Sequence, residues 1–109
     1  MNPGERIRLL LDRILWSLFR AVASEGCLRD FDVDGLTGIV CFGRLATVRR
    51  LVREMNAKVE EGDLEELRQL IMEHPREARR AIRYVRRRYK PIIRRLLREP
   101  SPDLEGVVR

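Results

Sequence analysis

Eleven basic side chains and one acidic side chain lie between Arg76 and Arg98, and this segment is the part of the sequence best suited to bind a ligand. It carries a net charge of +10, whereas the whole chain carries +6. A guanidinium group is a planar donor that can bind two phosphate oxygens at once, which an ammonium group does not match. Concentrated positive charge attracts polyanions, and nucleic acid is the commonest polyanion inside cells. The predicted contacts are Arg76, Arg79, Arg80, Arg83, Arg86, Arg87, Lys90, Arg94, Arg95 and Arg98; Arg88 completes the basic set.

The spacing of this segment predicts a helix with two opposite faces. Its apolar residues recur at steps of four and three, which is typical of a helix that buries one side. Its principal basic residues occupy the positions two residues earlier, and two residues correspond to about 200° of helical rotation. The basic face should therefore point away from the core. The apolar set is Ala78, Ile82, Val85, Tyr89, Ile92 and Leu96, and the basic set is Arg76, Arg80, Arg83, Arg87, Lys90 and Arg94, widened by Arg79, Arg86 and Arg95.

The composition of the same segment favours contact with the phosphate backbone over the reading of bases. A helix that reads base edges usually mixes arginine with Asn, Gln, Ser or Thr, and none of these four occurs between Arg76 and Arg98. Phosphate contacts position a protein without conveying sequence information. Tyr84 and Tyr89 are candidates for stacking on exposed bases, although the place of Tyr89 in the apolar set favours a core role. DNA and RNA, single-stranded or double-stranded, all stay open as ligands.

A second interpretation of the basic face is an acidic protein partner or a symmetry mate. The protein would then be a small helical subunit, of a ribonucleoprotein for example, or a self-assembling protein. A third interpretation is a solvated surface, partly neutralised by acids elsewhere in the chain. The acids that could do so are Glu60, Glu61, Asp63, Glu65, Glu66 and Glu73, and six acids are too few to offset eleven bases.

The run Asp30, Asp32, Asp34 and Gly35 matches the opening of an EF-hand calcium loop. The twelfth position of such a loop should be a bidentate Glu, but it is Cys41 here. The run is more simply an acidic turn whose Asp34 caps the helix that follows. We therefore predict no metal and no other cofactor, with a hard cation as the alternative.

The sequence does not contain a recognisable catalytic arrangement. His74 is the single histidine and has no nucleophile near it in sequence, so interaction with a helix C-terminus is its expected role. Cys27 and Cys41 are too few for a zinc site, and buried thiols are expected, with a disulfide between them as the alternative. No glycine-rich phosphate loop is present. The protein is predicted not to be an enzyme.

The fold predicted to position the basic face is all-α, a small four-helix bundle-like domain. Asn2 and Pro3 should begin the first helix, which should end near Ser24 and Gly26. A loop from Cys27 to Gly35 precedes a second helical segment from Leu36 to Val59; residues 39–42 could instead form a buried strand. The spacing of Asp63 and Glu66 predicts a capping box for a short third helix that ends near His74. Pro75 should begin the fourth helix, and Pro91 should kink or break it.

Composition places these helices in one domain over residues 1–98, followed by a flexible tail over residues 99–109. No apolar run approaches the roughly 20 residues of a membrane span, so no membrane contact and a cytoplasmic location are expected. Arginine outnumbers lysine 21 to 2, and side-chain amides are rare. This composition favours a protein from a thermophile, although a GC-rich genome would also enrich arginine.

Overall fold

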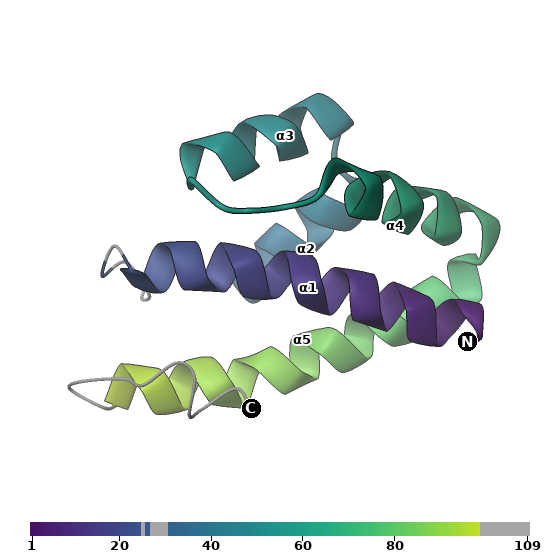
Figure 1. The fold of residues 1–109 in the computed structure, drawn as a ribbon. Helices are drawn as coiled ribbons and strands as arrows, with labels where there is room; N and C mark the ends of the chain where they lie inside the picture. Colours follow the sequence, from purple (N-terminus) through teal and green to yellow (C-terminus); the bar gives the residue numbers. More distant parts are fainter. Residues whose placement is uncertain (25, 27–30, 99–109) are drawn as a thin grey trace.

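The computed structural model describes residues 1–24, 26 and 31–98, and within these ranges it contains five α-helices and no strand. The predicted all-α, bundle-like architecture is confirmed. Figure 1 shows α1 and α5 running alongside each other as the two long helices; α2 and α4 pack against α5 as well, and α3 lies farthest from it. The helices are α1 (Pro3–Ser24), α2 (Val33–Phe42), α3 (Leu45–Glu54), α4 (Glu61–Glu73) and α5 (Pro75–Arg98).

Helix α1 begins where the sequence predicted, because Asn2 caps it. The Asn2 side-chain oxygen accepts a hydrogen bond from the Glu5 backbone N–H at 2.9 Å, and its amide donates to the Glu5 carboxylate at 2.9 Å. Pro3 occupies the first helical position, where its missing N–H has no intrahelical partner to lose. Gly26, with a φ of 76°, donates to the Ala23 carbonyl just after the last turn. Both ends of α1 are therefore determined by local chemistry.

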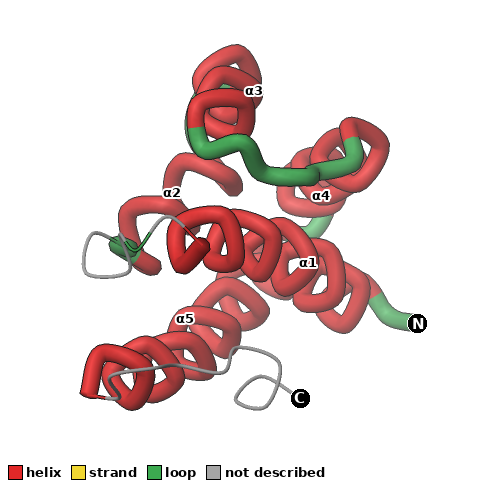
Figure 2. The backbone as a smooth tube through the Cα atoms, turned by 60° about the vertical axis from the view of Figure 1, so that its left-hand side comes forward, coloured by secondary structure: helices red, strands yellow, loops and turns green. Residues whose placement is uncertain are grey.

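The core surrounds α1, which is covered on two sides. Figure 2 shows α5 on one side of α1 and the three shorter helices on the other. This arrangement explains why the apolar face of α1 is so wide. Phe19 of α1 is fully buried in the core. Its ring stacks on that of Trp16, with centroids 5.4 Å apart, and makes an edge contact with the ring of Tyr89, with centroids 6.2 Å apart. The buried residues of α1 are Ile7, Leu10, Leu11, Ile14, Leu15, Leu18 and Phe19.

The predicted second helix, Leu36–Val59, is wrong as a single element, because it is divided into α2 and α3. Residues 39–42 are helical, so the strand alternative is not observed. Gly43 ends α2: its N–H donates to the Ile39 carbonyl at 2.9 Å, and a Cβ at this position would collide with the same carbonyl. Asp32, and not the predicted Asp34, caps α2 by accepting from the Gly35 N–H at 3.1 Å.

The predicted capping box of α4 is also wrong. The N-cap residue is Glu60, whose side chain makes no capping hydrogen bond, and Asp63 already lies inside the first turn. Asp63 pairs instead with Arg13 of α1 at 3.5 Å, and Glu66 binds Arg6 through two hydrogen bonds of 2.6 and 2.7 Å. Tertiary ion pairs have replaced local capping, because α1 brings arginines to this side of α4.

Two predictions fall outside the described residues. The tail over residues 99–109 and the Cys27–Cys41 disulfide both involve positions that the structure does not describe. Cys41 itself is a free, buried thiol. Burial raises the pKa of this thiol to about 12, so the group stays protonated and a weak nucleophile at neutral pH.

Candidate nucleic-acid interface

Helix α5 carries all the basic residues of the predicted site, and its buried side determines where they point. Pro75 begins α5 as predicted, directly after the α4 C-cap residue His74. The helix continues through Pro91 to Arg98 without a break, so the alternative of a separate final helix is not observed; the kink stays a prediction. The buried residues of α5 are Ala78, Ala81, Ile82, Val85, Tyr89, Ile93 and Leu96.

The observed apolar face differs from the predicted one near its end. Ile93 is buried, whereas the predicted Ile92 is only partly buried and packs at the edge of the core. Tyr89 is a core residue, as its position favoured: it is 2% exposed and its hydroxyl donates to the Asp12 carbonyl at 3.3 Å. This face packs against α1, α2 and α4 of the same chain.

The opposite side of α5 forms an exposed arginine face, as the spacing predicted. Seven of its arginines have exposed side chains without a hydrogen bond or ion pair to any other residue in the described ranges. At 1.5 Å per residue these positions extend over about 33 Å of helix. The face therefore presents a long row of uncompensated charge. The seven residues are Arg76, Arg79, Arg80, Arg83, Arg87, Arg94 and Arg98, and the exposed Arg95 lies beside them.

Four acids of the preceding helix α4 pair with other helices and not with this face. Glu66 and Asp63 pair with Arg6 and Arg13 of α1, and Glu61 binds Arg49 of α3. Glu65 lies 3.9 Å from Arg49 as well. The acidic side of α4 is therefore used by α1 and α3, and it leaves the arginines of α5 uncompensated.

Asp34 and Asp12 contact the basic set, although neither pair was predicted. Asp34 of α2 lies 3.2 Å from Lys90 Nζ and 3.4 Å from Arg86 Nε, and its backbone carbonyl accepts from Arg86 at 3.2 Å. Asp12 of α1 lies 3.4 Å from Arg88. Arg86 and Lys90 are thus tied to α2 through Asp34. The sequence separations of 52 and 76 residues explain why no local pattern indicated these pairs.

Two of the three aspartates of the aspartate run lie in the part of the chain that is described, and both have partners within the protein. Asp32 caps α2 and Asp34 pairs with α5, while Asp30 lies outside the described residues. Within the described ranges no three His, Cys, Asp or Glu side chains converge as metal ligands would. Both described aspartates therefore have structural partners.

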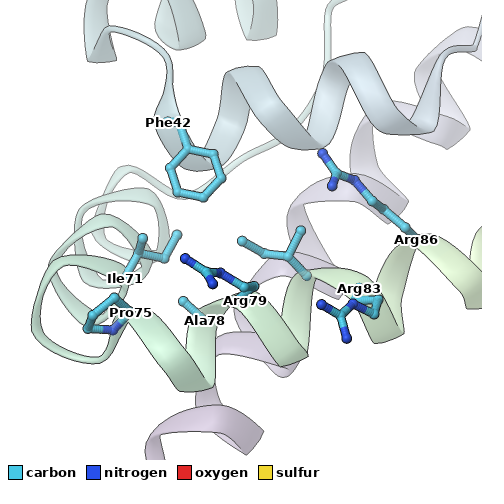
Figure 3. A pocket seen from close by; sticks show the side chains of 8 residues that line it. Phe42, Ile71, Pro75, Ala78, Arg79, Arg83 and Arg86 are labelled. Atoms are coloured by element: carbon cyan, nitrogen blue, oxygen red, sulfur yellow. The ribbon is translucent and has the colours of Figure 1, made fainter.

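A groove lies beside the arginine face, between α5 and the ends of α2 and α4. Its volume is about 390 Å³. Ile71, Ala78 and Ile82 are among the apolar residues that line it, and Arg79, Arg83 and Arg86 line it from α5. Figure 3 shows the ring of Phe42 directed from the end of α2 towards these residues. Phe42 is 65% exposed, and it was not among the predicted site residues.

A second aromatic side chain lies at the other edge of the arginine face. Tyr84 is 51% exposed, and the guanidinium carbon of Arg8 lies 4.8 Å from the centroid of its ring. Arg8 comes from α1, so the basic surface extends beyond α5 at this edge. Arg80 and Tyr84 line a shallow depression with Arg8. The arginine face thus has one exposed aromatic ring on each side.

Comparison with known proteins provides no assignment: no protein-family model, no curated protein and no solved structure matches the chain. Among the described residues, no helix is both long enough and apolar enough to cross a membrane. The inference of function therefore depends on the surface of α5 and its surroundings.

Proposed function

We propose that the protein binds the phosphate backbone of nucleic acid through the arginine face of α5, with little sequence preference and without catalysing a reaction. One observation supports this most directly. Seven exposed arginines share one side of a helix, while four acids of the neighbouring helix α4 pair with α1 and α3. Uncompensated guanidinium groups in a row attract an anionic polymer, and they carry no base-reading side chains beside them.

Several arginines acting together distinguish this surface from a specific anion site. A single bound phosphate needs two or three converging donors, whereas these side chains extend along one face of the helix. A polyanion with regularly repeated charges matches such a row. The proposal includes a cytoplasmic location and an origin in a thermophile. Both are supported by the amino-acid composition alone.

A salt titration with matched double variants tests the proposal. The Arg80→Ala/Arg87→Ala variant removes two charges from the arginine face. Arg50→Ala/Arg53→Ala removes two exposed charges from α3, which Figure 1 places on the far side of the molecule from α5. Binding of the wild type to DNA and RNA should weaken steeply with salt. The α5 variant should bind every sequence more weakly and reduce the salt slope by about two, whereas the α3 variant should leave both nearly unchanged.

Three results would reject the proposal. The first is absent or salt-independent binding to both DNA and RNA. The second is an equal effect of the two double variants, because net charge and not the α5 surface would then explain binding. The third is abolition of binding to one sequence alone by a single substitution, which is typical of base reading.

A further inference from the structure

The groove next to the arginine face combines an exposed aromatic ring with cationic side chains. Phe42 leaves 65% of its surface in solvent although most large apolar side chains of the described chain are buried. Its ring faces a groove of about 390 Å³, with Ile71 and Ile82 on the apolar lining. A solvent-exposed ring over an apolar groove can bind the face of a second flat group by stacking.

Helix α2, which carries Phe42, is held in place by contacts at both of its ends. Arg68 of α4 donates to the Val40 carbonyl at 3.0 Å and also to the Gly43 carbonyl, so it occupies the carbonyl groups that a helix end leaves without partners. Asp34, in the first turn of α2, binds Arg86 and Lys90 of α5. Both ends of α2 are thus fastened to neighbouring helices, which holds Phe42 at a defined place beside α5.

The charges around the groove determine what kind of flat group it would take. Arg79 and Arg83 line the groove, are exposed and have no acidic partner within the described ranges, so the ligand should carry negative charge next to its flat group. A nucleotide has this combination, with a planar base next to a phosphate. In a duplex the base faces are covered by their neighbours, so only an unpaired base can stack on a protein ring.

We infer that this groove is a stacking site for an unpaired nucleobase, with Phe42 against the base and Arg79 and Arg83 on the adjacent phosphates. The inference rests on the proposed function and sharpens it, because it assigns single-stranded nucleic acid as the preferred ligand.

The test compares three ligands of equal length: a pyrimidine strand with one fluorescent 2-aminopurine, the same strand annealed to its complement, and a strand with abasic sugars. Each is titrated with the wild type, Phe42→Ala, Phe42→Tyr and Met72→Ala. Met72 is 79% exposed on α4 and does not line the groove, so its substitution is a matched loss of an exposed apolar side chain. Circular dichroism verifies that each variant is folded.

The wild type should bind the base-carrying strand more tightly than the duplex or the abasic strand, and it should quench the 2-aminopurine. Phe42→Ala should weaken binding of the base-carrying strand about tenfold and remove the quenching, with the other two ligands unaffected. Phe42→Tyr should keep the binding of the wild type, because it keeps the aromatic face, and Met72→Ala should behave as the wild type.

Other results would overturn the inference and separate it from the proposed function. Equal wild-type affinity for the base-carrying and abasic strands would reject stacking while backbone binding stands, and this comparison needs no variant. An equal effect of Phe42→Ala on all three ligands would also reject it. Binding of an acidic peptide with an apolar anchor that Phe42→Ala abolishes, with strand binding unchanged, would assign the groove to a protein partner. If none of the three ligands binds, the proposed function fails as well.

Discussion

At the scale of single residues, Asp34 decides how much of the basic set can reach a ligand. It lies within 3.4 Å of Arg86 and 3.2 Å of Lys90, and it is about half exposed. An ion pair in contact with water contributes little to stability, so this aspartate is expected to affect the charge of the surface more than the fold. It competes with phosphate for two of the ten predicted contacts.

Replacing Asp34 with Asn should therefore strengthen binding to nucleic acid. The change removes one negative charge from the arginine face and releases Arg86 and Lys90 to a phosphate. We expect the dissociation constant to fall about threefold at low salt, and the gain to shrink as salt screens the added attraction. Fluorescence anisotropy with a labelled strand would measure this.

The control is Glu54→Gln, which makes the same charge change on α3, where Glu54 lies 3.9 Å from Arg50. A gain of similar size in both variants would indicate a general charge effect and would contradict the role given to Asp34. Asp12, which pairs with Arg88, has a smaller expected influence because Arg88 lies at the edge of the face.

At the scale of helices, α2 depends on a partner outside itself at its C-terminus. Arg68 donates to the Val40 and Gly43 carbonyls, and positive charge also suits the negative end of the helix dipole. Arg68→Ala would leave these carbonyl groups without that donor in a partly buried place.

We expect Arg68→Ala to lower the free energy of unfolding by about 1–3 kcal/mol, the range for hydrogen bonds with a charged donor. Urea denaturation followed by circular dichroism would measure it. Arg53→Ala on α3 is the control, because Arg53 is exposed and outside this contact. Equal stability of the Arg68 variant and the wild type would show that water replaces the guanidinium group without cost.

Helix α5 separates stability from binding on its two faces. Ile82 is 3% exposed and Leu96 is 2% exposed, so truncation of either removes buried apolar contacts. Ile82→Ala or Leu96→Ala should destabilise the protein by about 2–5 kcal/mol. Thermal or urea unfolding would measure this, and Arg87→Ala should leave stability nearly unchanged. A large loss of stability from Arg87→Ala would contradict the assignment of the two faces.

At the scale of the whole molecule, the buried Cys41 thiol and Tyr89 hydroxyl make the free energy of unfolding vary with pH in the alkaline range. Burial raises the pKa of the Cys41 thiol to about 12, and burial, helped by the nearby Asp12, raises the pKa of the Tyr89 hydroxyl above its usual value. In the unfolded chain both groups lose their protons at lower pH. The unfolded state therefore binds fewer protons than the folded state above about pH 9, and alkali favours unfolding.

The free energy of unfolding should fall as pH rises from about 9 towards 12, by about 1.4 kcal/mol per pH unit for each group that stays protonated only in the folded state. Urea denaturation across this range would measure the slope. Tyr89→Phe removes one of the two groups and should make the slope shallower at the upper end. A stability that does not vary above pH 9 would show that these groups are less buried than the structure places them.

Local patterns in the sequence were sufficient to predict the long helices and the side of α5 that carries charge. Asn2 and Pro3 begin α1 through contacts within one turn, Pro75 begins α5, and the 3.6-residue period separates the arginines from the apolar face. These features depend on neighbours a few residues apart, so the sequence alone contains them. The arginine face is therefore a property of the sequence as much as of the fold.

Other features were decided only when the helices packed. The spacing of Asp63 and Glu66 matches a capping box. In the folded protein, however, Glu66 forms an ion pair with Arg6 of α1 and Asp63 forms one with Arg13 of α1. Asp34 contacts Arg86 across 52 residues of sequence, and Phe42 is exposed because Gly43 ends α2 at the edge of the molecule. Ion pairs and exposure depend on distances between elements, and no periodicity along the chain encodes these distances.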